Sequence, residues 1–265
     1  MSDTEQPARF TDGAGYEKFM GQWSRMVGRI FLDWLSLPRN LKWLDVGCGT
    51  GAFTEVIQQV CNPSEIVAID PSAAQISYAT SRKIDERVQF KVADARAMPF
   101  ENGRFDIAAS ALVLNFIPDR EKALAEMRRV VRPAGVVAAY VWDFAGDRGT
   151  AQHLHFAITE LQGPGHRAGG LNAESTTENS LKTLFENVGF AGVVTRPIDI
   201  ALTYNDFEDY WSSNTGAGSP IGNIVKNLSD DKRQQLKQLV KTKLPASTDG
   251  KIAYMARANA VRGRV

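Results

Sequence analysis

The fold of this chain is decided by the stretch Leu44-Asp45-Val46-Gly47-Cys48-Gly49-Thr50-Gly51. An apolar run, 42–46, leads into it, and residues 53–60 behind it carry apolar side chains at helical spacing. The glycines allow a tight turn and let a ligand approach the backbone without meeting Cβ atoms. The stretch therefore predicts a strand, a turn and a helix, with a ligand at the carboxyl end of the strand.

The same alternation of apolar runs and amphipathic segments continues to residue 144. Further strands are expected at 66–69, 88–92, 107–111 and 136–142. Their apolar character suits strands that are buried on both faces. Ser72 begins a capping box, and Asp119 can cap a helix that ends before Pro133. We predict an α/β fold: a doubly wound, mostly parallel sheet of about seven strands.

The flanking segments are expected to be mainly helical. Helical or mixed structure is expected at 16–37, 146–177 and 205–244, a helix at 181–188 that ends at Gly189, and strands at 192–200 and 251–261. The segment 146–177 is expected to be a loop or insertion with one helical portion, and it holds all three histidines. The cationic side chains around 232–243 predict an amphipathic helix with a solvated basic face rather than a nucleic-acid site.

Composition narrows the class of protein. In the 265 residues, 31 Lys and Arg balance 30 Asp and Glu, which disfavours nucleic acid as a partner. No apolar stretch approaches the 18 or so residues of a membrane span, and the polar start of the chain suggests a cytoplasmic protein. Cys48, Cys61 and the three histidines cannot build a disulfide framework or a Cys-rich zinc site, so we expect no metal. A monomer or a homodimer is expected.

The ligand is expected to contain a nucleoside. Asp70 ends the apolar run 67–70, 19 residues after Gly51, where its carboxylate can accept hydrogen bonds from both ribose hydroxyls. The plainer alternative is a turn made by glycines and a strand that merely ends in Asp70. The spacing is G-x-G-x-G, not the G-x-G-x-x-G that binds a pyrophosphate. Asp45 would repel a pyrophosphate and attract an ammonium group, so the ligand should carry a positively charged amino-acid end.

Residues 16 to 144 resemble the class I S-adenosylmethionine-dependent methyltransferases, in particular the small-molecule and quinone-type group. The stretch 44–51 is similar to the family's first motif, which holds the methionine part of the cofactor. The run 67–70 is similar to the second, which implies Asp70 on the ribose and Pro71 beside the adenine. The run 92–95 is similar to the third, which implies Asp94 at the adenine amino group and the Ala95 amide at a ring nitrogen.

Three further segments extend this resemblance. The segment 105–115 resembles the fourth motif, which implies the backbone near Ala111 at the methionine amine. The run 132–135 resembles the entry to the fifth strand, although the family more often has Pro-Gly-Gly there. The run 16–25 resembles an amino-terminal helix in which Arg25 pairs with the cofactor carboxylate. The cofactor-binding residues implied are Arg25, Asp45, Gly47, Cys48, Gly49, Gly51, Asp70, Pro71, Asp94, Ala95 and Ala111.

The resemblance implies a single methyltransferase domain over 1–265, with the strand at 251–261 antiparallel to its neighbours. Its parts would be a helical cap (14–40), a cofactor-binding core (41–144) and substrate-lid elements (145–180 and 203–248). Substrate-binding candidates are Tyr16, Asn115, Trp142 and Trp211, and candidates for a general base are Asp143, His153 and His155. The reaction implied is in-line methyl transfer from S-adenosylmethionine, giving S-adenosylhomocysteine, to O, N or C of a small metabolite.

Three alternatives stay open at this point. A nicotinamide-dinucleotide oxidoreductase would bind a pyrophosphate over the turn at 47–51, which the glycine spacing and Asp94 argue against. A non-catalytic module would bind S-adenosylmethionine without turnover, because methyl transfer needs no diagnostic side chain. An RNA or protein acceptor is disfavoured by the near-zero net charge.

Overall fold

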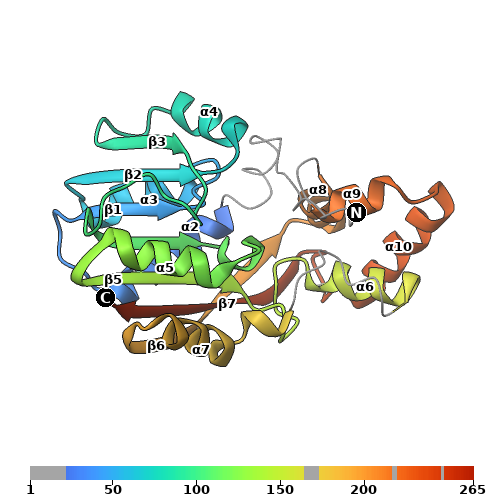
Figure 1. Ribbon diagram of the computed structural model, residues 1–265. Coiled ribbons are helices and arrows are strands. Elements are labelled where there is room, and N and C mark those ends of the chain that lie inside the picture. The colour runs from blue at the N-terminus through green and yellow to red at the C-terminus, as the bar shows by residue number, and fades with distance from the viewer. Residues whose placement is uncertain (1–21, 164–172, 217–219, 246–247) are drawn as a thin grey trace, which may run out of the picture.

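Seven strands form the central sheet in the part of the chain that the computed structural model describes, residues 22–163, 173–216, 220–245 and 248–265. The order is β3-β2-β1-β4-β5-β7-β6, and β7 runs antiparallel to both of its neighbours, β5 and β6, whereas the other pairs are parallel (Figure 1). The strands are β1 (Lys42–Val46), β2 (Glu65–Asp70), β3 (Val88–Val92), β4 (Phe105–Ala111), β5 (Val131–Trp142), β6 (Ala191–Tyr204) and β7 (Ile252–Arg264). The predicted doubly wound fold and the antiparallel last strand are confirmed.

Helices cover both faces of the sheet, as a doubly wound fold requires. They are α2 (Gln22–Leu35), α3 (Ala52–Cys61), α4 (Ala73–Ser81), α5 (Arg120–Val130), α6 (Gln152–Gln162), α7 (Glu178–Val188), α8 (Phe207–Thr215), α9 (Pro220–Lys226) and α10 (Asp230–Lys243). Short 3-10 turns, η2 (Leu114–Phe116) and η3 (Ala173–Thr176), complete the described elements. Because side chains alternate along a strand, Trp43 belongs to the buried cluster that contains α2 and α3 residues, whereas Leu44 belongs to the cluster that contains α5 and α7 residues.

The helix ends follow the predicted capping residues. Ser72 Oγ accepts a hydrogen bond from the Gln75 N–H at 3.4 Å, and an Asp119 carboxylate oxygen accepts from the Lys122 N–H at 2.9 Å. Gly189 ends α7 in the left-handed conformation, with φ of 90°. These three contacts are local, so the sequence alone was sufficient to predict them.

Three strands are longer than the apolar runs predicted. β5 begins at Val131 rather than 136, β6 continues to Tyr204, and β7 reaches Arg264. The end of β6 is set by its partner, since Tyr204 pairs with Ile252 of β7. β5 ends earlier, where Trp142 pairs with Ala258. The β6–β7 ladder therefore extends beyond the carboxyl end of β5, a result of long-range pairing that local periodicity does not contain.

Helices α6, α8, α9 and α10 gather at the far end of this ladder, on the right of Figure 1. The amphipathic helix expected around 232–243 is confirmed as α10, which buries Leu236 and Val240. Two lysines of its predicted solvated face lie over aromatic rings instead. Lys237 Nζ lies 5.2 Å from the Trp211 ring centre, and Lys241 Nζ lies 4.6 Å from the ring centre of Phe207. Both rings belong to α8, so the basic face of α10 helps to hold α8 in place.

Candidate functional site

The glycine loop joins β1 to α3 at the carboxyl edge of the sheet. The N–H groups of Gly47 and Cys48 both donate to the Ile69 carbonyl oxygen, at 2.8 and 2.9 Å, which ties the loop to the end of β2. Gly47 has a φ of 77°, and a Cβ atom there would lie 2.4 Å from Val113 Cγ1. Gly49 has a φ of 53°, but a Cβ atom there would meet no atom of the described residues within 4 Å. The loop is therefore closed at Gly47 and open at Gly49.

This difference gives a prediction for two alanine variants. Gly47→Ala should lower the free energy of unfolding by more than about 2 kcal/mol, because it combines left-handed strain with overpacking. Gly49→Ala should cost about 1 kcal/mol from backbone strain alone, while filling the open space before the loop. Urea unfolding of both variants measures the two costs. Equal destabilisation would show that the contact with Val113 is unimportant.

Asp45, in β1, is a fully buried carboxylate with one bonded and one unpartnered oxygen. Thr54 Oγ1 donates to Asp45 Oδ2 at 2.6 Å, whereas Oδ1 has no hydrogen-bond partner among the residues that the structure describes. Burial raises the pKa of Asp45 to about 7, the Thr54 hydrogen bond lowers it, and the charge of Asp70 raises it further. An unpartnered buried carboxylate oxygen is costly. A cationic ligand group at Oδ1 would remove that cost, which fits the ammonium predicted for this position.

Asp70 lies beside the same loop at the end of β2. Its Oδ2 accepts a hydrogen bond from the Gly49 N–H at 3.0 Å, and its Oδ1 accepts from the Ser72 N–H at 2.8 Å. Burial raises the pKa of Asp70, although both backbone hydrogen bonds act to lower it. Each oxygen keeps a second lone pair for a ribose hydroxyl. Pro71 follows on the exposed surface of the turn.

The remaining predicted cofactor residues end the neighbouring strands. Asp94 follows β3 and is half-exposed, with an Arg96 Nη2 donating to its Oδ2 at 2.7 Å, which lowers the pKa of Asp94. Ala95 comes next and is half-buried. Ala111 ends β4, and the Leu112 N–H after it donates to the Tyr140 carbonyl oxygen at 2.8 Å. All of these positions fall on the carboxyl edge of the sheet.

Cys48 and Arg25, two further predicted cofactor residues, both contact other parts of the chain. Cys48 is buried against Ala68 and Ile76, and burial raises the pKa of its thiol well above the usual range. That location suits a small side chain under the loop rather than a reactive thiol. Arg25, in α2, forms an ion pair with Glu55 at 3.0 Å. Its predicted contact with a cofactor carboxylate stays a prediction.

The substrate-side candidates are distributed over three elements, and Tyr16 lies outside the described residues. Asn115 lies in η2 and Trp142 ends β5. Asn115 Nδ2 and Trp142 Nε1 are both buried, and neither has a hydrogen-bond partner within the described part of the chain. Trp211 is buried in α8 and stacks on Phe207, with ring centres 6.0 Å apart. Asn115 and Trp142 therefore provide unpartnered donors at the carboxyl ends of β4 and β5, whereas Trp211 packs within the helical region.

The base candidates make contacts that differ from one another. Asp143 Oδ1 accepts a hydrogen bond from the Gly146 N–H at 2.8 Å and so shapes the turn after β5. His153 meets the edge of the Tyr254 ring at 4.8 Å, and burial lowers its pKa. His155 stacks on Phe144 at 6.3 Å. The two histidines face different neighbours, as their spacing on a helix requires.

Sequence reasoning missed two features of this region. Thr54 bonds the buried Asp45, and its position nine residues later in the first turn of α3 was a usable signal. An aromatic cluster of Tyr204, Tyr210 and Tyr254 joins the β6–β7 ladder to α8, with ring centres 5.1 to 6.3 Å apart. No local signal joins these tyrosines, because they come together only when the ladder forms.

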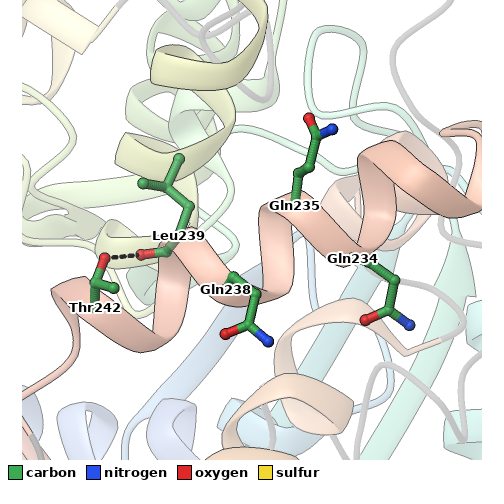
Figure 2. A pocket seen from close by; sticks show the side chains of 5 residues that line it. All are labelled: Gln234, Gln235, Gln238, Leu239 and Thr242. Carbon is green, nitrogen blue, oxygen red and sulfur yellow. Dashed lines mark hydrogen bonds between the residues drawn. The ribbon is translucent and has the colours of Figure 1, made fainter.

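A shallow hollow on α10 lies apart from the carboxyl edge. Figure 2 shows its lining, which comes from a single helix: Gln234, Gln235, Gln238, Leu239 and Thr242. Thr242 Oγ1 donates to the Leu239 carbonyl oxygen there at 2.7 Å. Within the described ranges, no helix is long and apolar enough to cross a membrane. In the same ranges, no group of three or more His, Cys, Asp or Glu is arranged to hold a metal ion.

The sheet order, the glycine loop and the carboxylates beside it define a Rossmann-like nucleoside-binding domain. Residues 44–139 match the family described as "Methyltransferase domain". The resemblance to class I S-adenosylmethionine-dependent methyltransferases, stated from the motifs, is confirmed over these residues.

Three similar proteins illustrate the range of that class. A sterol 4-C-methyltransferase of Caenorhabditis elegans is 33% identical over 108 residues, covering 40% of this chain and 32% of the relative. A ubiquinone/menaquinone biosynthesis C-methyltransferase of Hahella chejuensis is 30% identical over 116 residues, covering 42% of this chain and 47% of the relative. The matches thus span less than half the length of these curated relatives.

The third similarity is structural. A Haemonchus contortus phosphoethanolamine N-methyltransferase 2, solved with phosphomonomethylethanolamine and S-adenosylhomocysteine, superposes with a TM-score of 0.59 at 17% identity. The superposition covers 99% of this chain and 59% of that one. At this identity the similarity concerns the fold alone.

Proposed function

We propose that this protein transfers a methyl group from S-adenosylmethionine to an O, N or C atom of a small molecule. The observation that carries the proposal is the unpartnered, buried Oδ1 of Asp45 beside the open Gly49. A carboxylate in that place suits the ammonium group of an amino acid, and Asp70 next to it suits a ribose. A pyrophosphate would meet two carboxylates at the same loop, which disfavours a dinucleotide.

The protein's own part in the reaction is to bind, orient and exclude water. S-adenosylmethionine, when bound, supplies a methyl group attached to its sulfonium sulfur. The acceptor atom bonds to the methyl carbon in line with the carbon–sulfur bond, which breaks and leaves S-adenosylhomocysteine. Asp45 and the backbone near Ala111 would hold the amino end, Asp70 the ribose, and Asp94 with Ala95 the adenine. Fixing both reactants in line supplies much of the rate through effective molarity. Asp143, His153 and His155 stay candidates for a base where the acceptor arrives protonated.

The acceptor is proposed to be an apolar ring compound with a hydrogen-bonding substituent. Trp142 Nε1 and Asn115 Nδ2 are unpartnered donors that suit an oxygen acceptor. The relatives, one named as a sterol methyltransferase and one as a methyltransferase of ubiquinone/menaquinone biosynthesis, support an apolar ring. The segments 145–180 and 203–248 are proposed as the substrate lid, and 14–40 as the helical cap. The oligomeric state, a monomer or a homodimer, and the cytoplasmic location stay predictions.

Titration calorimetry with S-adenosylmethionine, S-adenosylhomocysteine and oxidised and reduced nicotinamide dinucleotides tests the cofactor. We expect micromolar binding of the two adenosyl-sulfur ligands only. Methyl transfer from radiolabelled S-adenosylmethionine to 1,4-dihydroxynaphthalene and to a sterol then tests the acceptor class. Binding without turnover on a broad acceptor panel would favour the non-catalytic module, and dinucleotide binding alone would favour the oxidoreductase.

The indole N–H of Trp142 gives a prediction once an acceptor is identified. Trp142→Phe should raise the KM of an oxygen-bearing acceptor about fivefold and leave the Kd of S-adenosylhomocysteine unchanged, since one neutral hydrogen bond is lost. Trp43→Phe is the matched control, because Trp43 Nε1 is also buried without a partner but lies near the amino end of β1. Equal kinetic effects of the two variants would contradict a contact between Trp142 and the acceptor.

A further inference from the structure

A chain of hydrogen bonds links the glycine loop to α2 through two arginines and one carboxylate. Arg82 Nη1 donates to the main-chain carbonyl oxygen of Thr50 at 2.9 Å, and Arg82 Nη2 donates to Glu55 Oε2 at 2.6 Å. Arg25 donates to the same Glu55 oxygen from Nε at 3.1 Å and from Nη2 at 3.0 Å. Thr50 lies inside the loop, so the guanidinium of Arg82 contacts the loop backbone directly.

The position of Arg82 makes this contact well defined. Arg82 is the C-terminal cap residue of α4, and its own backbone N–H is bonded to the carbonyl groups of Ala79 and Thr80. Only 18% of its side chain is exposed. A planar guanidinium can bond a carbonyl and a carboxylate at once and holds both in fixed directions. Burial acts to raise the pKa of Glu55, but hydrogen bonds from Arg82 and Arg25 lower it, so the carboxylate stays ionised.

Hydrogen bonds therefore restrain the loop at one backbone N–H group and at one backbone carbonyl group. The carboxylate of Asp70 accepts the Gly49 N–H at 3.0 Å, and the guanidinium of Arg82 donates to the Thr50 carbonyl at 2.9 Å. Glycine backbone has wide conformational freedom, so a loop of this composition keeps one shape only when contacts outside it restrain it. Asp70 and Arg82 supply restraints of opposite charge on neighbouring residues.

We propose that Arg82 is a positioning residue, which holds the glycine loop in the conformation that receives the amino-acid part of the cofactor. The inference rests on the proposed function, because it assigns the loop to that ligand. Glu55 keeps the guanidinium in place and connects it to Arg25, so α2 and α4 support the loop together. Arg82 itself touches neither the adenosine nor the methyl group in this assignment.

Calorimetric titration of Arg82→Met and Arg82→Lys with S-adenosylhomocysteine and with adenosine tests the proposal. The lysine variant keeps a positive charge at the end of α4, where it favours the helix, but lacks the planar fork. For both variants we expect S-adenosylhomocysteine to bind about tenfold more weakly, since a charge-assisted hydrogen bond is lost. Adenosine, which lacks the amino-acid part, should weaken less than twofold.

Arg104→Met is the matched control. Arg104 forms an ion pair with Glu65 at the same 2.6 Å distance, at the amino end of β2, and its side chain is 33% exposed against 18% for Arg82. The Arg104→Met variant should bind S-adenosylhomocysteine and adenosine as tightly as the unaltered protein does. Equal weakening of S-adenosylhomocysteine and adenosine by the Arg82 variants would indicate general damage and overturn the proposal, as would unchanged binding. Failure of the unaltered protein to bind S-adenosylhomocysteine would overturn the proposed function as well.

Discussion

Asp45→Asn should weaken S-adenosylmethionine binding by about tenfold to a hundredfold, while the ligand-free protein becomes no less stable. The affinity falls because a charged hydrogen-bond partner of the ligand ammonium is removed. Stability does not fall, because the variant replaces a fully buried carboxylate, one oxygen of which has no partner, by a neutral amide of the same shape. Calorimetric titration and thermal unfolding of the same samples measure the two effects.

The pH dependence of the Tm of the unaltered protein and of Asp45→Asn tests the burial of this carboxylate more sharply. Burial raises the pKa of Asp45 to about 7 in the folded protein, against about 3.9 in an unfolded chain. The folded state therefore binds the extra proton, and its stabilising contribution is complete below pH 4 and lost as the pH rises through 7. The difference in Tm between Asp45→Asn and the unaltered protein should grow in favour of the variant between pH 4 and 8.

As the pH rises, the unaltered protein should lose stability but gain affinity for the cofactor. The ammonium group of S-adenosylmethionine pairs with the ionised carboxylate, so affinity should rise from pH 5 to 7 in the unaltered protein and stay nearly flat in Asp45→Asn. Asp199→Asn is the control, because Asp199 pairs with Arg257 on the β6–β7 ladder, away from the loop. A parallel pH profile in all three proteins would show that Asp45 does not meet the ligand.

Asp70→Ala should weaken the binding of both S-adenosylhomocysteine and adenosine, by about 1 to 3 kcal/mol in binding free energy. The two ligands share the ribose, and the variant removes the oxygens that face it. It also leaves the N–H groups of Gly49 and Ser72 without their present partner. This shared loss distinguishes Asp70 from Arg82, whose variants should spare adenosine.

Titration of both ligands, together with thermal unfolding of Asp70→Ala, measures this effect. Asp70→Asn is a graded variant, because its amide keeps one acceptor oxygen and should lose less affinity. A folded Asp70→Ala protein that binds both ligands as tightly as the unaltered chain would refute the ribose contact.

The local parts of the fold and site were determined by the sequence. The glycine spacing, the strand that ends in Asp70 and the caps Ser72, Asp119 and Gly189 depend on neighbours within a few residues, so periodicity and residue type predict them. The order of the motifs was sufficient to predict the sheet and the class of domain. The lone antiparallel strand came with the resemblance, not with any local pattern.

Only the tertiary structure decided which groups meet across long sequence separations. The unpartnered oxygen of Asp45, the contact of Arg82 with Thr50 and the aromatic cluster around Tyr204 depend on packing between distant elements. The length of β6 likewise depends on pairing with β7, since Tyr204 at its end pairs with Ile252 about fifty positions later. Burial and pairing are properties of the assembled chain, and a local pattern holds no information about which distant residue will supply them.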